Sequence, residues 1–586
     1  MNNRNETSAR LLPKTAKADG DRDGVPASRP RPRLLNSALA IAAAVVLSFV
    51  LLPRVPELKK GDIASRDITA PFTMYVEYSA PDQTLLFARV QRGEVIVAAG
   101  HRVTEKAEAV LAEMARREGI GSRLGAFAGL TLLVLLVFYL FYRDVRRYRP
   151  ALLSDSRKMV LLVVLLLQTV IVSRLLQAVL SLMAETSHLQ SSTVGFALPA
   201  ASGAMLVSLL LDFHLALAFS FIVSLFLGMA FPGEPFLPLY YFLGSIVSAL
   251  YVIRCKKRTV IIRAAAMTAI MNALAIISID LYQGELVARG VFDLVAGLLA
   301  AIMTASIASV AVPFLESIFD IATDIKLLEL LDPNQPLLKD LVYKSPGTYH
   351  HSILIGNLSE AAAEAIGENP LLARVGASYH DIGKIQMPEY FIENQRTNEN
   401  KHDRLSPSMS SLIITSHVRE GVELARQYRL PSAVVDIVRQ HHGNSLITYF
   451  YQKAKELQPG AVIADQDFRY PGPRPRTKVA AIVMLADAVE AASRTLMDPT
   501  HQQIQNVVNN VITRIFLDDQ LSMCDLTLKD LREIAKSFTN ILRGIYHHRI
   551  DYPGVEFPGA KKRSDHPDKK HPEEARAGGA VRTGTS

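Results

Sequence analysis

The sequence contains no tryptophan and only two cysteines, Cys255 and Cys524, among its 586 residues. Two cysteines cannot form the disulfide framework that stabilises many small secreted domains, so that class of protein is excluded. Residues 337–552 contain no G-x-G-x-x-G motif, no G-K-[ST] motif and no alternation of strand and helix patterns. A dinucleotide-binding fold and a P-loop fold are therefore excluded from this part of the chain.

Apolar residues make up 49% of the chain, and the mean hydropathy is +0.19. Both values are high for a soluble protein, and the length favours at least two domains. The net charge of +8 would suit nucleic acid binding, but the Lys and Arg residues cluster beside apolar runs. Such clusters are typical of membrane topology, so we expect the lipid bilayer as a partner and no nucleic acid polymer.

The N-terminal part of the chain divides into four segments. Residues 1–33 are polar and are expected to form a disordered cytoplasmic tail, and 34–53 have the length of a transmembrane anchor. Residues 54–122 form a small polar segment, with a strand predicted at 94–98 and a helix from Thr104. Residues 123–315 predict a seven-helix transmembrane domain, with spans near 124–142, 159–182, 194–211, 213–231, 236–254, 260–281 and 291–315.

Basic residues predict the orientation of these spans. Lys and Arg are abundant in 143–158 and 254–258, whereas the connections 185–193 and 232–235 contain none. By the positive-inside rule, the basic connections are cytoplasmic. Both termini are then cytoplasmic, and residues 54–122 form a small extracytoplasmic segment of mixed α and β structure.

Residues 316–336 predict an amphipathic connecting helix, which could equally be the first helix of the domain that follows. The pattern in 337–552 is helical throughout and predicts a cytoplasmic all-helical domain. Residues 553–586 are charged and are expected to form a second disordered tail. The predicted fold class is thus all-α, a polytopic membrane helix bundle with an all-helical cytoplasmic domain.

Imidazole and carboxylate side chains recur at apolar helical positions of this domain. Burying them without partners would be unfavourable, so their number indicates metal ligation. Such ligands suit Mn, Fe or Zn, and a carboxylate can bridge two cations. Lys384, which follows the His-Asp pair, could bind a phosphate oxygen. The predicted metal ligands are His351, His380, Asp381, His417, His441, His442 and Asp487.

The motifs PGTYHHSILIGN, ASYHDIGK, PEYFIENQ and FRYPGPRPRTKVAAIVMLADAVEAASRTL resemble the seven-transmembrane HD family. This family comprises the PgpH-like cyclic di-AMP phosphodiesterases and belongs to the HD superfamily of metal-dependent phosphohydrolases. The resemblance implies two divalent transition-metal ions, Mn or Fe, in a multi-pass protein of the bacterial plasma membrane. It also implies hydrolysis of cyclic di-AMP to pApA.

The resemblance also implies how the ligands divide. His351, His380, Asp381 and Asp487 would hold one metal, and Asp381, His417, His441 and His442 the other. His351 is preferred to His350 because the first histidine of the superfamily usually precedes a serine. Asp381 and Lys384 would serve catalysis, with a cyclic dinucleotide as substrate.

Two alternatives to this activity stay open. The same fold could act on cyclic di-GMP, (p)ppGpp or a dNTP, or the domain could be a non-catalytic membrane receptor. An effector acting at the membrane domain or the extracytoplasmic segment is one route of regulation. The extracytoplasmic segment is shorter than in relatives, and the oligomeric state is undetermined.

Overall fold

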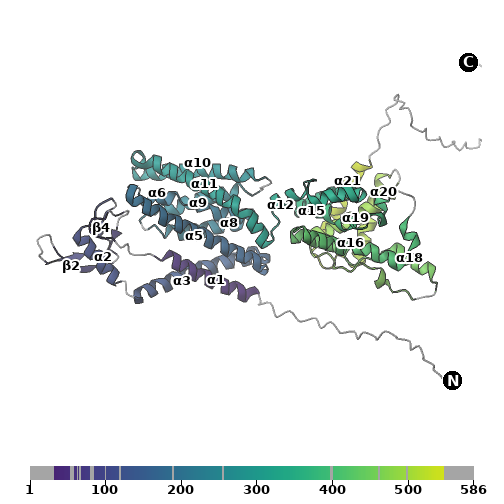
Figure 1. Ribbon diagram of the computed structural model, residues 1–586, viewed down its shortest axis with the longest axis horizontal. Coiled ribbons are helices and arrows are strands. Elements are labelled where there is room, and N and C mark those ends of the chain that lie inside the picture. The colour runs from purple at the N-terminus through teal and green to yellow at the C-terminus, as the bar shows by residue number, and fades with distance from the viewer. Residues whose placement is uncertain are drawn as a thin grey trace, which may run out of the picture.

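The described residues of the computed structural model form three regions along one long axis (Figure 1). They are residues 32–546 without 53–57, 63, 65–67, 71, 80–84, 99, 118–119, 188–189, 232, 254–256, 396–399, 460–461 and 497–498. Both predicted tails lie almost wholly outside this set, as does Cys255. A small α/β module, a helix bundle and a second helical domain follow one another (Figure 1).

The small module contains two antiparallel strand pairs and one helix. Strand β1 (Ile68–Thr69) pairs with β4 (Val95–Val97), and β2 (Met74–Ser79) pairs with β3 (Leu85–Val90). Helix α2 (Glu105–Arg117) begins where the sequence predicted, because the hydroxyl of Thr104 accepts a hydrogen bond from the amide of Ala107 at 3.2 Å. The predicted strand at 94–98 is confirmed as β4.

The middle region is a bundle of apolar helices. Five segments are long and apolar enough to cross a membrane, and three shorter apolar helices accompany them among the described residues. The predicted span at 194–211 is two helices, α6 and α7, because Pro199 lies in the break between them. The helices are α1 (Pro32–Leu51), α3 (Ile120–Tyr148), α4 (Pro150–Ser154), α5 (Ser156–Ser187), α6 (Ser191–Phe196), α7 (Ala201–Leu210), α8 (Phe213–Gly228), α9 (Leu237–Leu250), α10 (Thr259–Gln283) and α11 (Leu286–Phe319).

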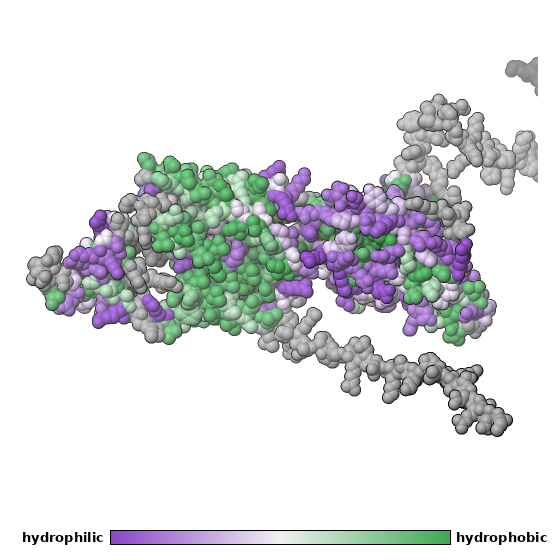
Figure 2. Space-filling model, viewed as in Figure 1, coloured by the Kyte–Doolittle hydropathy of each residue, from purple (hydrophilic) through white to green (hydrophobic). Residues whose placement is uncertain are grey.

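The surface of the bundle is apolar. Large side chains such as Leu132 (69%) and Ile262 (68%) are exposed, which would be unfavourable in water but suits lipid. Figure 2 shows hydrophobic residues over the middle region and mostly hydrophilic residues at the two ends. Inside the bundle, the amide of Asn272 donates to the carbonyl oxygen of Gly297 at 3.0 Å and joins α10 to α11.

The connection between bundle and second domain differs from the single helix expected over 316–336. Helix α11 continues to Phe319, and Asp320 then adopts the left-handed conformation at φ 56°. A new helix, α12 (Asp324–Leu330), begins after Thr323, whose hydroxyl accepts from the amide of Lys326 at 3.2 Å. The chain breaks here because a left-handed residue ends one helix and a capping threonine starts the next.

The second domain is helical, as predicted. Helix α19 lies at its centre and is buried along almost its whole length, because its sequence is apolar on every face. The helices are α13 (Pro336–Lys344), α14 (Pro346–Ala365), α15 (Pro370–Tyr379), α16 (Pro407–Gln427), α17 (Ser432–Gln440), α18 (Thr448–Leu457), α19 (Lys478–Ser493), α20 (His501–Leu517) and α21 (Leu528–Ile545), with 3₁₀ turns η1 (Ile382–Ile385), η2 (Pro388–Tyr390), η3 (Ile392–Asn394), η4 (Lys401–Arg404) and η5 (Asp465–Phe468).

Replacing Tyr379 by phenylalanine should loosen the junction between α12 and α15. The buried Tyr379 hydroxyl donates to the carbonyl oxygen of Leu330 at 2.7 Å, and its loss leaves that carbonyl unpaired. We expect a loss of about 1–3 kcal/mol in the free energy of unfolding, measured by denaturant unfolding of the purified protein in detergent. Tyr343→Phe, at a side chain that is 71% exposed, is the control and should change stability little.

Candidate metal centre

Seven ligand-type side chains converge in the second domain from within α14, α16 and α19 and from the residues that directly follow α15 and α17. Within each of two groups, the ligand atoms all lie within 4.8 Å of one another. These are all seven of the predicted metal ligands. One group is Asp381, His417, His441 and His442, and the other is His351, His380 and Asp487.

The carboxylate of Asp381 lies between the two groups. Its Oδ1 is 3.2 Å from His417 Nε2 and 3.6 Å from His441 Nε2. Its Oδ2 is 3.2 Å from His380 Nε2 and 3.7 Å from His351 Nε2. Each oxygen thus faces a different set of imidazoles, which is the arrangement that a bridging carboxylate requires.

Backbone carbonyls orient three of the histidines. In each, Nδ1 lies close to the carbonyl oxygen three residues earlier, at 2.6 Å in His380, 2.5 Å in His417 and 2.8 Å in His441. A carbonyl can only accept, so Nδ1 carries the proton and donates it. This hydrogen bond fixes the orientation of each ring and leaves Nε2, which is directed to the centre, as the nitrogen that could serve as a ligand.

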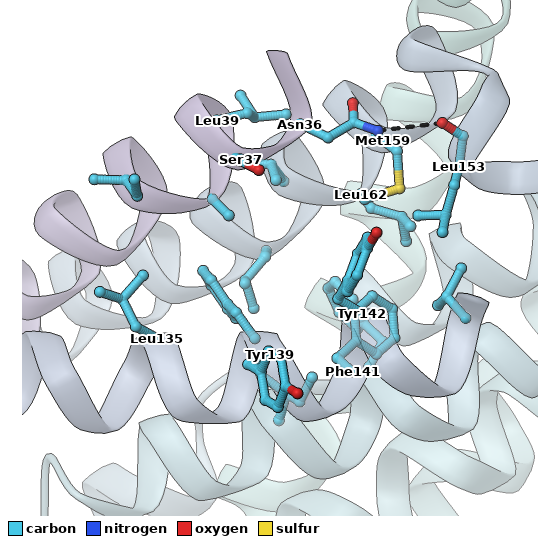
Figure 3. Close-up of a pocket in the computed structure, with 18 residues that line it drawn as sticks. Asn36, Ser37, Leu39, Leu135, Tyr139, Phe141, Tyr142, Leu153, Met159 and Leu162 are labelled. Carbon is cyan, nitrogen blue, oxygen red and sulfur yellow. Dashed lines mark hydrogen bonds between the residues drawn. The ribbon is translucent and has the colours of Figure 1, made fainter. Parts of the chain in front are cut away.

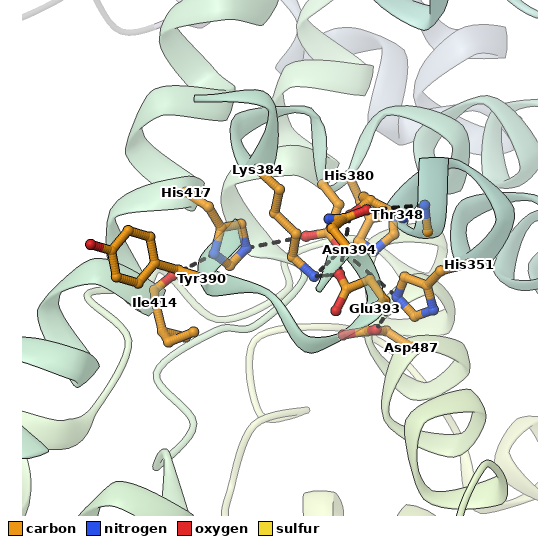
Figure 4. A network of polar contacts seen from close by, with 12 residues as sticks. Thr348, His351, His380, Lys384, Tyr390, Glu393, Asn394, Ile414, His417 and Asp487 are labelled. Atoms are coloured by element: carbon orange, nitrogen blue, oxygen red, sulfur yellow. Dashed lines mark hydrogen bonds and ion pairs between the residues drawn. The ribbon is translucent and has the colours of Figure 1, made fainter. Parts of the chain in front are cut away.

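Helix α19 supplies a carboxylate partner for His351. Nδ1 of His351 donates to Glu490 Oε2 at 2.7 Å. Its Nε2 lies 3.1 Å from Asp487 Oδ1 (Figure 4). Burial alone would lower the pKa of His351, but these two hydrogen bonds outweigh it and raise the pKa to about 9. A cation at Nε2 would have to displace that proton.

Glu490 was not predicted as a site residue. It is buried, and its other oxygen accepts from Arg494 Nε at 2.8 Å. A signal was present in the sequence, since Glu490 follows Asp487 by nearly one helical turn within an apolar helix.

Lys384 lies beside Asp381 in a buried ion-pair network. Its Nζ is 2.7 Å from Asp381 Oδ2 and 2.8 Å from Glu393 Oε1 (Figure 4). Burial alone would lower the pKa of Lys384, but the charges of Asp381 and then Glu393 raise it, so the amine is protonated. Glu393, to which Thr348 donates at 3.1 Å, was also missed from the sequence.

His442 is held by an aromatic stack. Its ring lies 4.1 Å from the ring of Tyr470, at an interplanar angle of 27°. Burial and then the neighbouring His441 hold the pKa of His442 well below its usual range. The imidazole is therefore neutral, which is the form that binds metal.

The residues of this centre fit divalent transition metals. His380 Nε2 and Asp381 Oδ1 are buried, yet neither has a hydrogen bond of acceptable geometry among the described residues. Buried polar atoms normally have a hydrogen-bond partner. Two ligand atoms without one, in the same cluster, indicate that cations are their partners. Imidazole with carboxylate suits Mn, Fe or Zn better than Ca. The cluster is thus a His/Asp metal-binding centre.

Comparisons with known proteins agree with this arrangement. A family model described as "7TM receptor with intracellular HD hydrolase" matches residues 124–323, and an HD domain model matches 348–492. The cyclic-di-AMP phosphodiesterase PgpH of Bacillus subtilis is 39% identical over 398 residues, which are 65% of this chain and 55% of that protein. PgpH of Listeria monocytogenes is 33% identical over 481 residues, 80% of this chain and 65% of that protein.

A solved structure also matches the second domain. It is the HD domain of the L. monocytogenes phosphodiesterase PgpH in complex with cyclic-di-AMP, with 47% sequence identity and a TM-score of 0.35. The match covers 37% of this chain and 100% of that one. The chain spans less than two thirds of the length of the two curated relatives, at 55% and 65%.

A substitution at Gly383 should disturb the centre without removing any ligand. A Cβ there would lie 1.9 Å from the carbonyl oxygen of His417 and 2.6 Å from the amide nitrogen of Gly421, so η1 and α16 would have to separate. For Gly383→Ala we expect metal content at limiting metal to fall about 10-fold or more, measured by elemental analysis.

Gly356→Ala is the matched control, because its Cβ would meet its nearest neighbour at 3.6 Å, an ordinary contact. Equal metal content in Gly383→Ala and the wild type would contradict the proposed dependence of the centre on this close packing.

Proposed function

We infer that the chain belongs to the family of membrane proteins that join a seven-transmembrane region to an intracellular HD domain. On this premise we propose that it is a metal-dependent phosphodiesterase that hydrolyses cyclic di-AMP to pApA. The observation that carries the proposal is the position of Asp381 between two groups of ligand atoms. A shared carboxylate is the usual feature of two-metal sites that act on phosphate esters.

We assign His351, His380, Asp381 and Asp487 to one cation, and Asp381, His417, His441 and His442 to the other. Manganese or iron suits this ligand set. Divalent cations at such a centre supply Lewis acidity, which activates water and offsets negative charge on a phosphodiester.

The chain's own residues hold and orient these groups. Glu490 fixes the ring of His351 through Nδ1, and the backbone carbonyls fix His380, His417 and His441. Lys384 holds Asp381 Oδ2 and keeps a positive charge at the centre, where it would attract a substrate phosphate.

Cyclic di-AMP is proposed as the substrate because both curated relatives named above are cyclic-di-AMP phosphodiesterases. The ligand set itself acts on the phosphodiester and does not read the base. Hydrolysis of another nucleotide and ligand binding without catalysis are therefore the outcomes that an experiment has to separate.

We also propose that both termini and the second domain are cytoplasmic, with the small module on the opposite side of the membrane. In support, the basic end of α3 and the second domain lie at the same end of the bundle, and the small module lies at the other (Figure 1). The positive-inside rule assigns the basic end to the cytoplasm.

Replacing Asp381 should abolish both metal retention and turnover. For Asp381→Ala we expect a loss of at least about 10³-fold in the rate of pApA formation, because one substitution removes the carboxylate that we assign to both cations. The measurement is product identification by mass spectrometry, with metal analysis of the same sample. Asp340→Ala, a surface substitution in α13, is the control.

The wild-type protein should be assayed with cyclic di-AMP, cyclic di-GMP, (p)ppGpp and dNTPs side by side. If the protein hydrolyses only one of the other nucleotides, that nucleotide and not cyclic di-AMP is its substrate. Retained metal and turnover in Asp381→Ala would contradict the proposed centre, and metal binding without any turnover would favour a receptor.

We propose further that the membrane region regulates the centre through α17. The carboxylate of Asp320, which directly follows the last bundle helix, accepts from the amide of Ser432 at 3.0 Å. Ser432 begins α17, and His441 and His442 directly follow its last residue, Gln440. Arg157 lies 3.5 Å from the other oxygen of Asp320. One short helix thus connects the bundle to two metal ligands.

Removing this carboxylate should change the activity of the centre. We expect Asp320→Gly, which tolerates the left-handed conformation, to alter turnover by about 2- to 30-fold, the range over which single residues modulate coupling between sites. Asp320→Asn retains an oxygen that can accept from Ser432 and should behave like the wild type. Turnover is measured in full-length protein in nanodiscs, and identical rates for all three proteins would disprove the coupling.

A further inference from the structure

We propose that the basic end of the bundle holds a bound anionic phospholipid, with an acyl chain between α1, α3, α5 and α8 and its phosphate at the arginines that end α3. This inference is independent of the proposed activity. It depends on an apolar cavity, on a charged recess close to it, and on a hydrogen bond that links their linings.

The apolar cavity has a volume of about 370 Å³. Its lining comes from the N-terminal half of α1, the C-terminal half of α3, the start of α5, and Phe219 and Ile222 of α8 (Figure 3). Most of the lining is aliphatic or aromatic, and it comes from helices of the apolar bundle. An acyl chain is the ligand that such a lining would bind in a bilayer.

The basic recess has a volume of about 480 Å³ and is lined by Arg143, Asp144, Arg146, Arg147 and Tyr148. The three arginines outweigh the one aspartate, and all lie on the exposed last turns of α3. Residues 143–158 as a whole contain six Lys or Arg and two Asp. A cluster of this kind attracts an anionic headgroup at the membrane surface.

Tyr139 connects the two spaces. Its ring lines the apolar cavity, and its hydroxyl accepts a hydrogen bond at 3.2 Å from Arg143, which lines the recess. One amphiphilic molecule could therefore contact both, with its tail beside the Tyr139 ring and its phosphate beside the guanidinium of Arg143.

Asn36 adds a further polar position at the edge of the cavity. Its amide nitrogen donates to the carbonyl oxygen of Leu153 at 3.2 Å, which identifies the other atom as the oxygen (Figure 3). That oxygen is buried, in a residue only 9% exposed, and has no hydrogen-bond partner among the described residues. It can accept from a headgroup hydroxyl, so a glycerol headgroup fits better than a methylated choline.

The test uses full-length protein, delipidated in mild detergent and then mixed with dioleoylphosphatidylglycerol or dioleoylphosphatidylcholine. Lipid retained after gel filtration is quantified by mass spectrometry. We expect the wild-type protein to retain about one more molecule of phosphatidylglycerol per chain than of phosphatidylcholine. In Arg146→Gln/Arg147→Gln the excess should fall about 10-fold or more, since each cation near a membrane surface contributes about fivefold.

Lys257→Gln/Arg263→Gln is the matched charge control, because it removes two exposed cations next to and within α10 and should retain the excess. Ala40→Trp fills the cavity and should displace the lipid, whereas Ala38→Trp places the same side chain on an exposed position of α1 that does not line it.

Equal retention of the two lipids by the wild type would overturn the proposal, because it would indicate only general lipid contact. The proposal would also be overturned if Arg146→Gln/Arg147→Gln retained as large an excess of phosphatidylglycerol over phosphatidylcholine as the wild type. If Ala40→Trp fails to fold, as judged by gel filtration, the charge variants alone decide the question.

Discussion

The burial of Asp381 is the constraint on which the second domain depends. A carboxylate with 1% exposure is stable as an anion only if positive charge or hydrogen-bond donors surround it. The ammonium of Lys384 supplies that positive charge here, while the imidazoles of His380 and His417 lie against the same carboxylate. Even so, one oxygen has no hydrogen bond, and nearby imidazole nitrogens are directed toward it. Metal cations at this centre would complete the balance of charge.

Helix ends and central packing together place the ligands. His380 and His441 follow α15 and α17 directly, where the last carbonyls of a helix lack partners within it and can accept from Nδ1. The buried α19 then carries Asp487 and Glu490 to the opposite side of the centre. Because the side chains of α19 are packed on every face, a shift of this helix would disturb both the hydrophobic core and the ligand geometry.

The same packing makes the centre sensitive to the membrane region. Asp320 joins the end of α11 to the start of α17, so one residue contacts both a bundle helix and a helix that positions two ligands. The basic connection between α3 and α5 reaches the same point through Arg157. A lipid held at the end of α3 would therefore lie next to the chain segment through which the bundle contacts the second domain.

The sequence alone predicted the fold class, most of the apolar helices and the seven ligand-type residues that the structure brings together, and their roles as metal ligands stay a prediction. It could do so because long apolar runs have few alternatives to a membrane span, and because histidines and aspartates at apolar helical positions have few explanations other than a shared ligand. Such patterns are local, and each is visible within one helix or one pair of neighbouring residues.

Only the tertiary structure decided which groups support those ligands. Glu490 contacts His351 across 139 residues of sequence, and the close approach of Gly383 to α16 depends on two elements that meet only in the folded chain. The helical period of 316–336 predicted one continuous helix, but the chain breaks at Asp320. The side chain of Asp320 instead accepts a hydrogen bond from the first residue of α17, more than 100 residues later. Periodicity reports which face of a helix is apolar, but the partner that packs against that face is determined by the whole fold.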